Sequence, residues 1–284
     1  MISDHRCFAC FTRAFEKLVE KENISVAGKE SFTRSMTELF RKRKDSFSAP
    51  LLSRDLHLLL RTYTNNPDPY KKEKRINNDL ALSMLPRLEY IVSQSGDPFK
   101  TALRLAIAGN IMDFAANGNF NLGETIDKAL LSDFAIDHSN ILKERIEKAL
   151  SVLYLGDNAG EIVFDKLLIQ TINHPNLTYA VRGAPVINDA TIEDAEYVGM
   201  NDIANVISNG YDAPSTVPDK SSNEFKKYFW ESQLIISKGQ GNLEGLLPLN
   251  DERIFFLLTV KCDVIAEYLK VDKNSFVVCN TCSG

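Results

Sequence analysis

The stretch LYLGDNAGEIVFDK, Leu153–Lys166, contains the change of pattern that decides the fold. Its apolar start is typical of a short buried strand, and apolar residues at helical spacing begin after Glu161. Between them, Asp157 and Asn158 stand side by side in a glycine-containing loop. The sequence therefore predicts a strand, a tight polar loop and a helix, with a carboxylate and a carboxamide at the end of the strand.

The same alternation continues through the rest of the chain. Short apolar runs alternate with helical segments or polar loops, at residues 151–155, 177–181, 205–208, 233–237, 253–259 and 275–278. Such alternation is typical of parallel strands joined by crossover helices. We therefore expect residues 126–284 to form an α/β layered domain with a mainly parallel sheet.

Residues 1–125 are predicted to form an all-helical N-terminal domain. The run CFACFTRAFEKLV at residues 7–19 places its aromatic and aliphatic residues on one helical face. Another helix is expected after the Asp-Pro pair at residues 97–98, and it is apolar nearly all round, so it should be buried. Within it, Asn110 and Asp113 are three residues apart and share a face. Either they form hydrogen bonds near the helix end, or they face a polar cavity on the substrate side of a pocket.

Composition excludes some classes of partner. The chain has 284 residues and a formal net charge of −5. Its densest basic cluster, RKRKD at residues 41–45, is explained by a solvated helix face, so no nucleic-acid partner is expected. No apolar run approaches the ~18 residues that cross a bilayer, and no signal peptide is visible. We therefore expect no membrane partner and a cytoplasmic location.

Polar residues gather where four successive predicted strands end. The loops are GDNAGE, RGAPVINDAT, NGYDAPST and KGQGN, at residues 156–161, 182–191, 209–216 and 238–242. Ligands of parallel sheets bind beyond the carboxyl ends of the strands. A structural loop requires turn-forming residues, but it does not require a lysine and two groups of carboxylates on the same edge. This coincidence is the strongest functional signal in the chain.

Three of these residues form a candidate metal site. Asp157, Asn158 and Asp189 offer the oxygen ligands that suit Mg²⁺ or Mn²⁺. Two carboxylates balance the charge of a divalent ion, and the neutral amide adds an oxygen without a third negative charge. Because the protein ligands add no negative charge beyond the two that balance the ion, the site still attracts a phosphate dianion.

Neighbouring residues are candidates for binding phosphate. We expect Lys238 and Arg182 to hold phosphate oxygens, with backbone N–H groups of the turn at Gly239 as further donors. Asn188 is assigned to the substrate side. Glu161, at the start of its helix, is a candidate outer ligand, support for a ligand, or base. The nucleophile is either metal-bound water or the first aspartate of the metal site.

Each of these residues also has a purely structural explanation. Asp157 or Asn158 would serve as a helix N-cap, and the Asn-Asp pair at residues 188–189 as a cap or Asx-turn. Lys238 would be solvated, and Arg182 would pair with a nearby acid. One shared site accounts for all four features at once.

The cysteines and histidines point to no other chemistry in these loops. Two C-x-x-C pairs, at residues 7–10 and 279–282, form a four-thiolate metal site or a redox pair if the termini meet; otherwise they are core or surface thiols. The four histidines lie outside the strand-end loops. This disfavours a histidine-rich zinc site and a Ser-His-Asp arrangement.

In these loops the sequence resembles a known family. GDNAGEIVFD, RGAPVINDAT, SNGYDAPST and SKGQGNLEGL, with ALRLAIAGNIMDF upstream, look like the metal-dependent damage-control phosphatases, formerly domain of unknown function eighty-nine. The N-terminal C-x-x-C resembles the prokaryotic branch. The resemblance implies a three-layer α/β/α domain with a helical N-terminal region. It also implies hydrolysis of small phosphomonoesters, such as damaged phosphometabolites and sugar phosphates, with Mn²⁺, Mg²⁺, Co²⁺ or Ni²⁺.

The resemblance also carries over to single residues. The family's metal ligands match Asp157, Asn158 and Asp189, and its strand-end lysine matches Lys238. Eukaryotic members have an aspartate near Gln240, so their sugar-phosphate preference is in doubt here. Two alternatives stay open, a non-catalytic protein that binds a phosphometabolite and an S-adenosylmethionine-dependent carboxyl methyltransferase, as some human relatives are named. The oligomeric state is left open.

Overall fold

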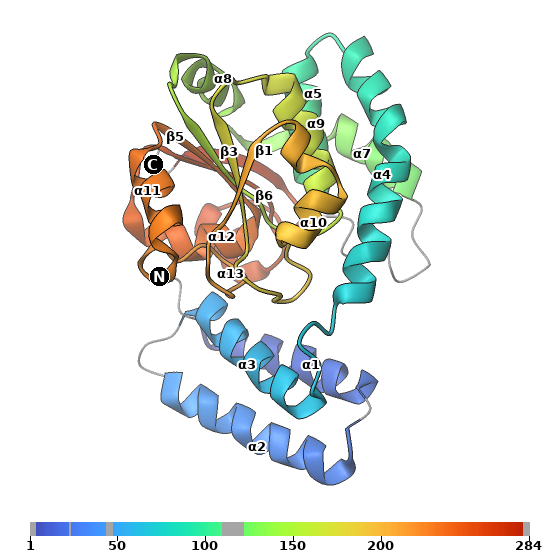
Figure 1. Ribbon diagram of the computed structural model, residues 1–284, viewed down its shortest axis with the longest axis vertical. Helices are drawn as coiled ribbons and strands as arrows, with labels where there is room; N and C mark the ends of the chain where they lie inside the picture. Colours follow the sequence, from blue (N-terminus) through green and yellow to red (C-terminus); the bar gives the residue numbers. More distant parts are fainter. Residues whose placement is uncertain (1–3, 23, 44–47, 110–121, 281–284) are drawn as a thin grey trace.

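The computed structural model describes residues 4–22, 24–43, 48–109 and 122–280 (Figure 1). A seven-stranded sheet is the centre of the molecule, with strand order β1-β7-β6-β5-β2-β3-β4. All neighbouring strands pair in parallel except β6 and β7, which pair antiparallel. The strands are β1 Phe134–Asp137, β2 Val152–Leu155, β3 Leu177–Val181, β4 Asn205–Ser208, β5 Leu234–Lys238, β6 Ile254–Thr259 and β7 Phe276–Asn280.

Helices cover both faces of this sheet, as the α/β/α prediction requires. One face carries α5 Pro98–Ala108, α7 Leu122–Leu131, α8 Ser139–Lys148, α9 Glu161–Ile172 and α10 Ile192–Tyr197, with α4 Lys71–Gln94 packed on α9. The other face carries α11 Asn223–Glu231, α12 Gly239–Leu246 and α13 Asp263–Leu269. Short 3₁₀ turns occur at Met200–Asp202, Pro218–Lys220 and Leu247–Leu249. The three-layer architecture and the mainly parallel sheet are confirmed.

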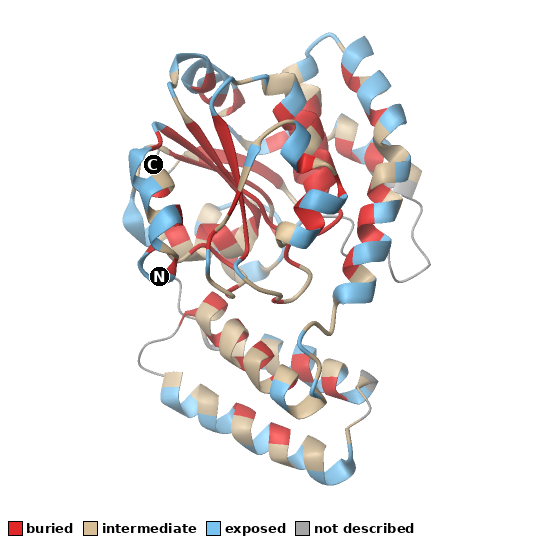
Figure 2. Ribbon diagram, in the orientation of Figure 1, coloured by how far each residue is buried: buried red, intermediate tan, exposed pale blue. Residues whose placement is uncertain are grey.

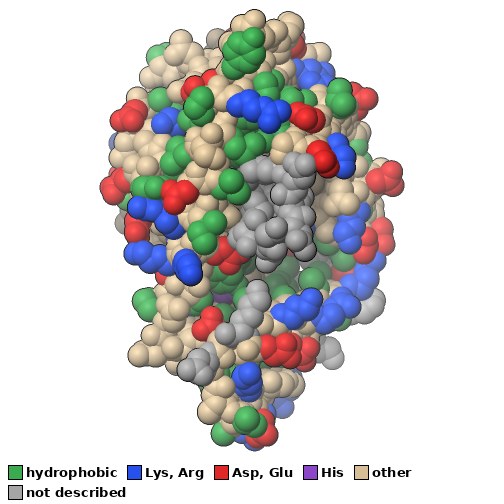
Figure 3. Space-filling model, turned by 90° about the vertical axis from the view of Figure 1, so that its right-hand side faces the viewer, with side chains coloured by type: hydrophobic (Ala, Val, Ile, Leu, Met, Phe, Trp, Pro, Cys, Tyr) green, Lys and Arg blue, Asp and Glu red, His purple; other side chains and the backbone are tan. Residues whose placement is uncertain are grey.

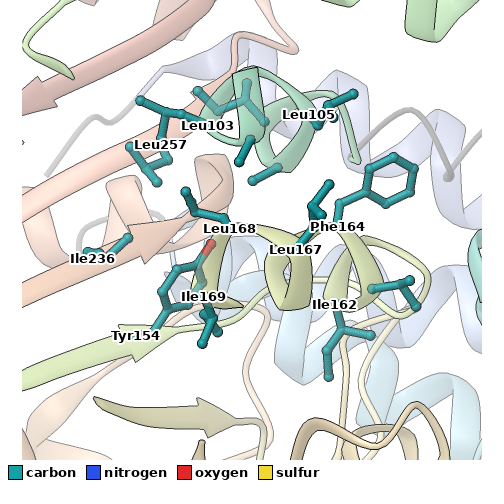
Figure 4. Close-up of a cluster of buried hydrophobic side chains, with 14 of the residues drawn as sticks. Leu103, Leu105, Tyr154, Ile162, Phe164, Leu167, Leu168, Ile169, Ile236 and Leu257 are labelled. Carbon is teal, nitrogen blue, oxygen red and sulfur yellow. The ribbon is translucent and has the colours of Figure 1, made fainter. Parts of the chain in front are cut away.

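The central strands are apolar along their whole length because both of their faces are covered. All residues of β2, β3 and β5 are buried, and Figure 2 shows these strands in red through the middle of the molecule. Parallel sheets covered on both sides have this continuous apolar pattern. On one face, Tyr154 and Ile236 belong to the same apolar cluster as Leu168 of α9, and α5 packs on α9 (Figure 4).

A separate bundle of three helices lies beyond the carboxyl ends of the parallel strands (Figure 1). These are α1 His5–Lys21, α2 Val26–Arg43 and α3 Ala49–Thr64. They share their own core, which contains Phe15, Phe32, Leu52, Leu56 and Leu60. By contrast, α4 and α5 belong to the core of the sheet. The apolar cores therefore divide between α3 and α4, earlier than the domain boundary expected near residue 125.

Two further features concern the sheet edge and the surface. β1 was not expected from the sequence, because its four residues alternate in burial at the edge of the sheet. On the face drawn in Figure 3, positive and negative side chains are interspersed. Within the described residues, no helix combines the length and apolar character needed to cross a membrane.

Candidate active site

The loop after β2 is held in a conformation that requires glycine. Gly160 has a φ of 77°, and a Cβ added there would lie 3.0 Å from the Cβ of Asn77 on α4. Its N–H donates a hydrogen bond of 2.6 Å to Oδ1 of Asn78. This anchor on α4 fixes the turn between β2 and α9. Asp157 and Asn158 are thereby presented beyond the carboxyl end of β2.

The loop after β3 is joined to this turn by backbone hydrogen bonds. The N–H of Ala159 donates to the carbonyl oxygen of Asn188, and the N–H of Ala190 donates to that of Asp157, both at 2.8 Å. Asn158 and Asp189 form an isolated β-bridge between the same two loops. Asp189, which is distant in the sequence, is therefore adjacent in the fold to Asp157 and Asn158.

One buried guanidinium connects the two aspartates. Arg182 Nε lies 2.5 Å from Asp189 Oδ2, and Nη2 lies 3.2 Å from Asp157 Oδ1. Nη1 donates to Asn242 Oδ1 at 3.1 Å and to Thr216 Oγ1 at 3.3 Å. Of the two roles considered for Arg182, the structure shows pairing with acids. Because a buried arginine keeps its charge, it balances part of the negative charge of the site.

Lys238 points away from the loops, into the space between β5, α5 and α9. Its ammonium group donates to Glu161 Oε1 and to Asp165 Oδ1, both at 2.6 Å, and to the carbonyl oxygen of Ala106 at 2.8 Å. An ammonium group has three N–H donors, so these bonds use all of them. Burial alone would lower the pKa of Lys238, but the two carboxylates outweigh burial and raise it.

Asp165 completes this buried group. It accepts hydrogen bonds from the hydroxyls of Tyr154, at 2.7 Å, and Tyr179, at 2.9 Å, in addition to the bond from Lys238. The side chain is completely buried. The sequence analysis missed Asp165 and both tyrosines. The signal was a charged residue one turn after Glu161, on the same face of a helical segment rich in apolar residues.

Glu161 links the lysine to the expected metal site. Its Oε2 accepts from Asn158 Nδ2 at 3.1 Å, and Asp157 Oδ2 accepts from the same nitrogen at 3.2 Å. Burial raises the pKa of Glu161 above its usual value, against the opposing charge of Lys238. Because Asp157 Oδ2 and Glu161 Oε2 both accept from Nδ2 of Asn158, the amide is oriented so that its Oδ1 is available to a ligand.

A cleft of about 280 Å³ lies between the strand ends and the helical bundle. Asp157, Asn158, Asn188 and Asp189 line it. The remaining lining residues come from the bundle, the later loops and α12: Phe11, Ala49, Pro50, Ser53, Ile187, Pro214, Gln240, Gly241, Glu244 and Lys261. Four other expected site residues are buried and do not line the cleft: Arg182, Lys238, Glu161 and Gly239. Asn110 and Asp113 are outside the described residues.

The donor set of the cleft fits a hard divalent ion. In the described parts of the chain, no group of three or more His, Cys, Asp or Glu residues is arranged as a metal site. The cleft instead offers two carboxylates and one amide oxygen, which are ligands that Mg²⁺ and Mn²⁺ accept together with water.

Gly239 permits a close approach to this donor set. A Cβ at Gly239 would lie 2.0 Å from Asp157 Oδ2, and φ is 81°. Only glycine lets the start of α12 lie directly against this carboxylate. One turn further, Asn242 donates from Nδ2 to the carbonyl oxygens of Lys238, at 2.7 Å, and Gly156, at 3.2 Å. Asn242, which sequence reasoning missed, thus ties the loops after β2 and β5 together.

The cysteines lie apart from this donor set. Cys7 and Cys10 are on α1, and Cys279 is on β7; Cys282 is outside the described residues. Burial raises the pKa of the Cys7 thiol to about 11 and that of Cys279 to about 12. Protonated thiols are poor nucleophiles and poor metal ligands. The expected four-thiolate or redox pairing therefore stays a prediction.

Comparison with known proteins gives one consistent result. The family description "Damage-control phosphatase ARMT1-like domain" matches residues 3–277. A damage-control phosphatase of Pyrococcus horikoshii is 32% identical over 278 residues, which is 96% of each chain. One of Archaeoglobus fulgidus is 37% identical over 217 residues, 74% of this chain and 75% of that protein. A crystal structure of a DUF89 family protein from Pyrococcus horikoshii superposes with a TM-score of 0.87 at 31% identity, over 99% of both chains.

Proposed function

The chain belongs to the damage-control phosphatase family with the ARMT1-like domain, and from that premise we propose that it is a metal-dependent phosphomonoesterase. The single observation that carries the proposal is the convergence of Asp157, Asn158 and Asp189 on one cleft at the ends of β2 and β3. The proposed substrates are small phosphate esters, in keeping with a cleft of about 280 Å³.

Asp157, Asn158 and Asp189 would hold the divalent ion, with Mn²⁺ or Mg²⁺ as the proposed metal and Co²⁺ or Ni²⁺ as substitutes. When bound, such an ion supplies Lewis-acid polarisation of the phosphoryl group. Arg182 keeps both carboxylates in place and reduces their mutual repulsion, as its hydrogen bonds to each support. Asn188, which lines the same cleft, is proposed to contact the substrate.

Lys238 and Glu161 are proposed to position the site. Neither lines the cleft, and Lys238 has all three donors occupied. Their contacts instead fix the amide of Asn158 through Glu161 Oε2. This replaces the direct phosphate contact first expected for Lys238. The N–H groups at the start of α12 remain the proposed backbone donors, because that helix begins against Asp157.

The test is release of inorganic phosphate from a panel of phosphometabolites. We expect turnover with Mn²⁺ and its loss with a chelator, restored by added metal. Asp157→Ala should reduce kcat/KM by about 100-fold or more, because it removes one metal ligand. Asp219→Asn, at an exposed carboxylate, is the matched control and should leave turnover unchanged. Full turnover in Asp157→Ala, or turnover that ignores the chelator, would refute the proposal.

A further inference from the structure

Glu244 is a cleft residue that the proposed chemistry does not use. It lies on α12, one helical turn after Gln240, and both side chains line the cleft. The expected metal ligands line the same cleft from the loops after β2 and β3. The cleft therefore combines the expected metal ligands with a third carboxylate, supplied by a different element.

The surroundings of Glu244 leave most of its hydrogen-bonding capacity available. Within the described residues it forms no ion pair, and its one hydrogen bond comes from Gln240 Nε2, at 2.9 Å to Oε1. A carboxylate has about four acceptor positions on its two oxygens. Burial raises the pKa of Glu244, in keeping with its few partners. Glu244 is partly buried and lines the cleft with acceptor positions to spare, so donor groups of a bound ligand can bind there.

Gln240 holds this carboxylate in a fixed place. Its Nε2 also lies 3.4 Å from the sulfur of Cys262, and its Oε1 accepts from the backbone N–H of Lys261 at 3.0 Å. Both ends of the amide are therefore engaged by the protein. Gln240 thus supports Glu244, and Glu244 is the acceptor that faces the cleft.

The bundle adds residues to the cleft that favour contact with the carbon atoms of a ligand. Phe11 comes from α1, and Ala49 and Pro50 come from α3. Such walls provide apolar contact but few hydrogen bonds. Ser53 and Lys261 also line the cleft, but Glu244 is the carboxylate that α12 adds to it, and it is the strongest acceptor available to donors on a leaving group.

We propose that Glu244 is a specificity-determining residue that selects phosphate esters whose leaving group carries hydrogen-bond donors, either hydroxyl or ammonium. The inference rests on the proposed phosphatase function, which places the phosphate at the metal-binding end of the cleft. The leaving group then extends toward α12. A leaving group without donors leaves the carboxylate without a partner and is bound less well.

The experiment compares three esters on the full-length protein with Mn²⁺. Glycerol phosphate carries hydroxyl donors, phosphoethanolamine carries an ammonium group, and propyl phosphate carries no donor on its leaving group. Wild type should prefer at least one donor-bearing ester to propyl phosphate. Glu244→Gln should reduce kcat/KM for that ester by about 10-fold or more, mainly through KM, because a neutral amide oxygen replaces a charged acceptor and forms a weaker hydrogen bond. For propyl phosphate, the change should stay within about twofold.

Glu231→Gln, at an exposed carboxylate of α11, is the matched control and should change none of the three rates. An equal loss for all three esters in Glu244→Gln, or no loss for any, would overturn the inference while leaving the phosphatase function intact. If wild type hydrolyses none of the three esters, the phosphometabolite panel decides the phosphatase proposal separately. Calorimetric titration of the same esters then tests Glu244. A wild-type binding preference for donor-bearing esters that disappears in Glu244→Gln supports the inference. A preference that persists in Glu244→Gln, or no preference in wild type, overturns it.

Discussion

Asn158 shows how single residues organise the candidate site. Its amide nitrogen lies between Asp157 and Glu161, so its oxygen is the atom left for a cation. Glu161 is in turn held by Lys238, which also binds Asp165. A buried ion pair of this kind contributes little net stability when complete, but losing one partner leaves an uncompensated charge. The arrangement therefore makes the orientation of a metal ligand depend on a lysine that does not itself reach the cleft.

Replacing the buried lysine tests this dependence. Lys238→Met should lower the free energy of unfolding by about 3–5 kcal/mol, because two carboxylates lose their cation, and urea denaturation measures the change. It should also weaken Mn²⁺ binding by about 10–100-fold, as loss of support for a metal ligand does. Lys220→Met, at an exposed lysine, is the control. Unchanged Mn²⁺ affinity in Lys238→Met would show that the lysine does not act on the site.

Glycine substitution gives a second test at the residue scale. Gly239→Ala should weaken Mn²⁺ binding and reduce turnover, because the new Cβ would lie 2.0 Å from Asp157 Oδ2 at a residue whose φ is 81°. Gly96→Ala is a matched control, since a Cβ there meets nothing within 4 Å. Its effect on stability should stay within about 0.5 kcal/mol. Similar metal affinities for the two variants would mean that α12 does not constrain Asp157.

At the scale of elements, polar contacts join the helical bundle to the loops and helices beside the sheet. Asp212, in the loop after β4, binds Arg54 Nε at 2.5 Å and Arg61 Nη2 at 2.8 Å, both from α3. Arg61 also donates to the carbonyl oxygen of Pro185 at 3.1 Å. α1 adds a salt bridge of 2.7 Å between Arg6 and Glu267 of α13. Because the bundle has its own core, these polar contacts and the packing of α3 on α12 hold it against the cleft.

Loosening this contact should affect binding more than chemistry. Asp212→Asn should raise KM several-fold with a smaller change in kcat, since the bundle supplies a wall of the cleft but no expected metal ligand.

Burial alone would raise the pKa of Asp212, but Arg61 and Arg54 outweigh burial and lower it. Its contribution to stability is therefore present at neutral pH and is lost as pH falls through that lowered pKa. Accordingly, the difference in stability between wild type and Asp212→Asn should disappear in acid. In the kinetic comparison of Asp212→Asn with wild type, a loss of kcat without a change in KM would contradict the role of Asp212 in holding the bundle against the cleft.

At the scale of the whole molecule, the sequence predicted the layered α/β fold because burial of parallel strands leaves a local apolar pattern. It also predicted the residues that meet at the strand ends, since parallel strands place their carboxyl ends on one edge. It did not predict β1, whose short edge strand has little apolar signal. Nor did it predict the direction in which Lys238 points, because that depends on packing against α5 and α9. The contacts of Asp165 and Asn242 join distant segments, so the local sequence does not show their partners.

The most direct test of the central claim is a crystal structure of the protein grown with Mn²⁺, with the ion located by its anomalous signal. The account predicts one peak in the cleft, within about 2.5 Å of oxygen atoms of Asp157, Asn158 and Asp189. A peak held by other residues, or no peak in the cleft at saturating Mn²⁺, would contradict it.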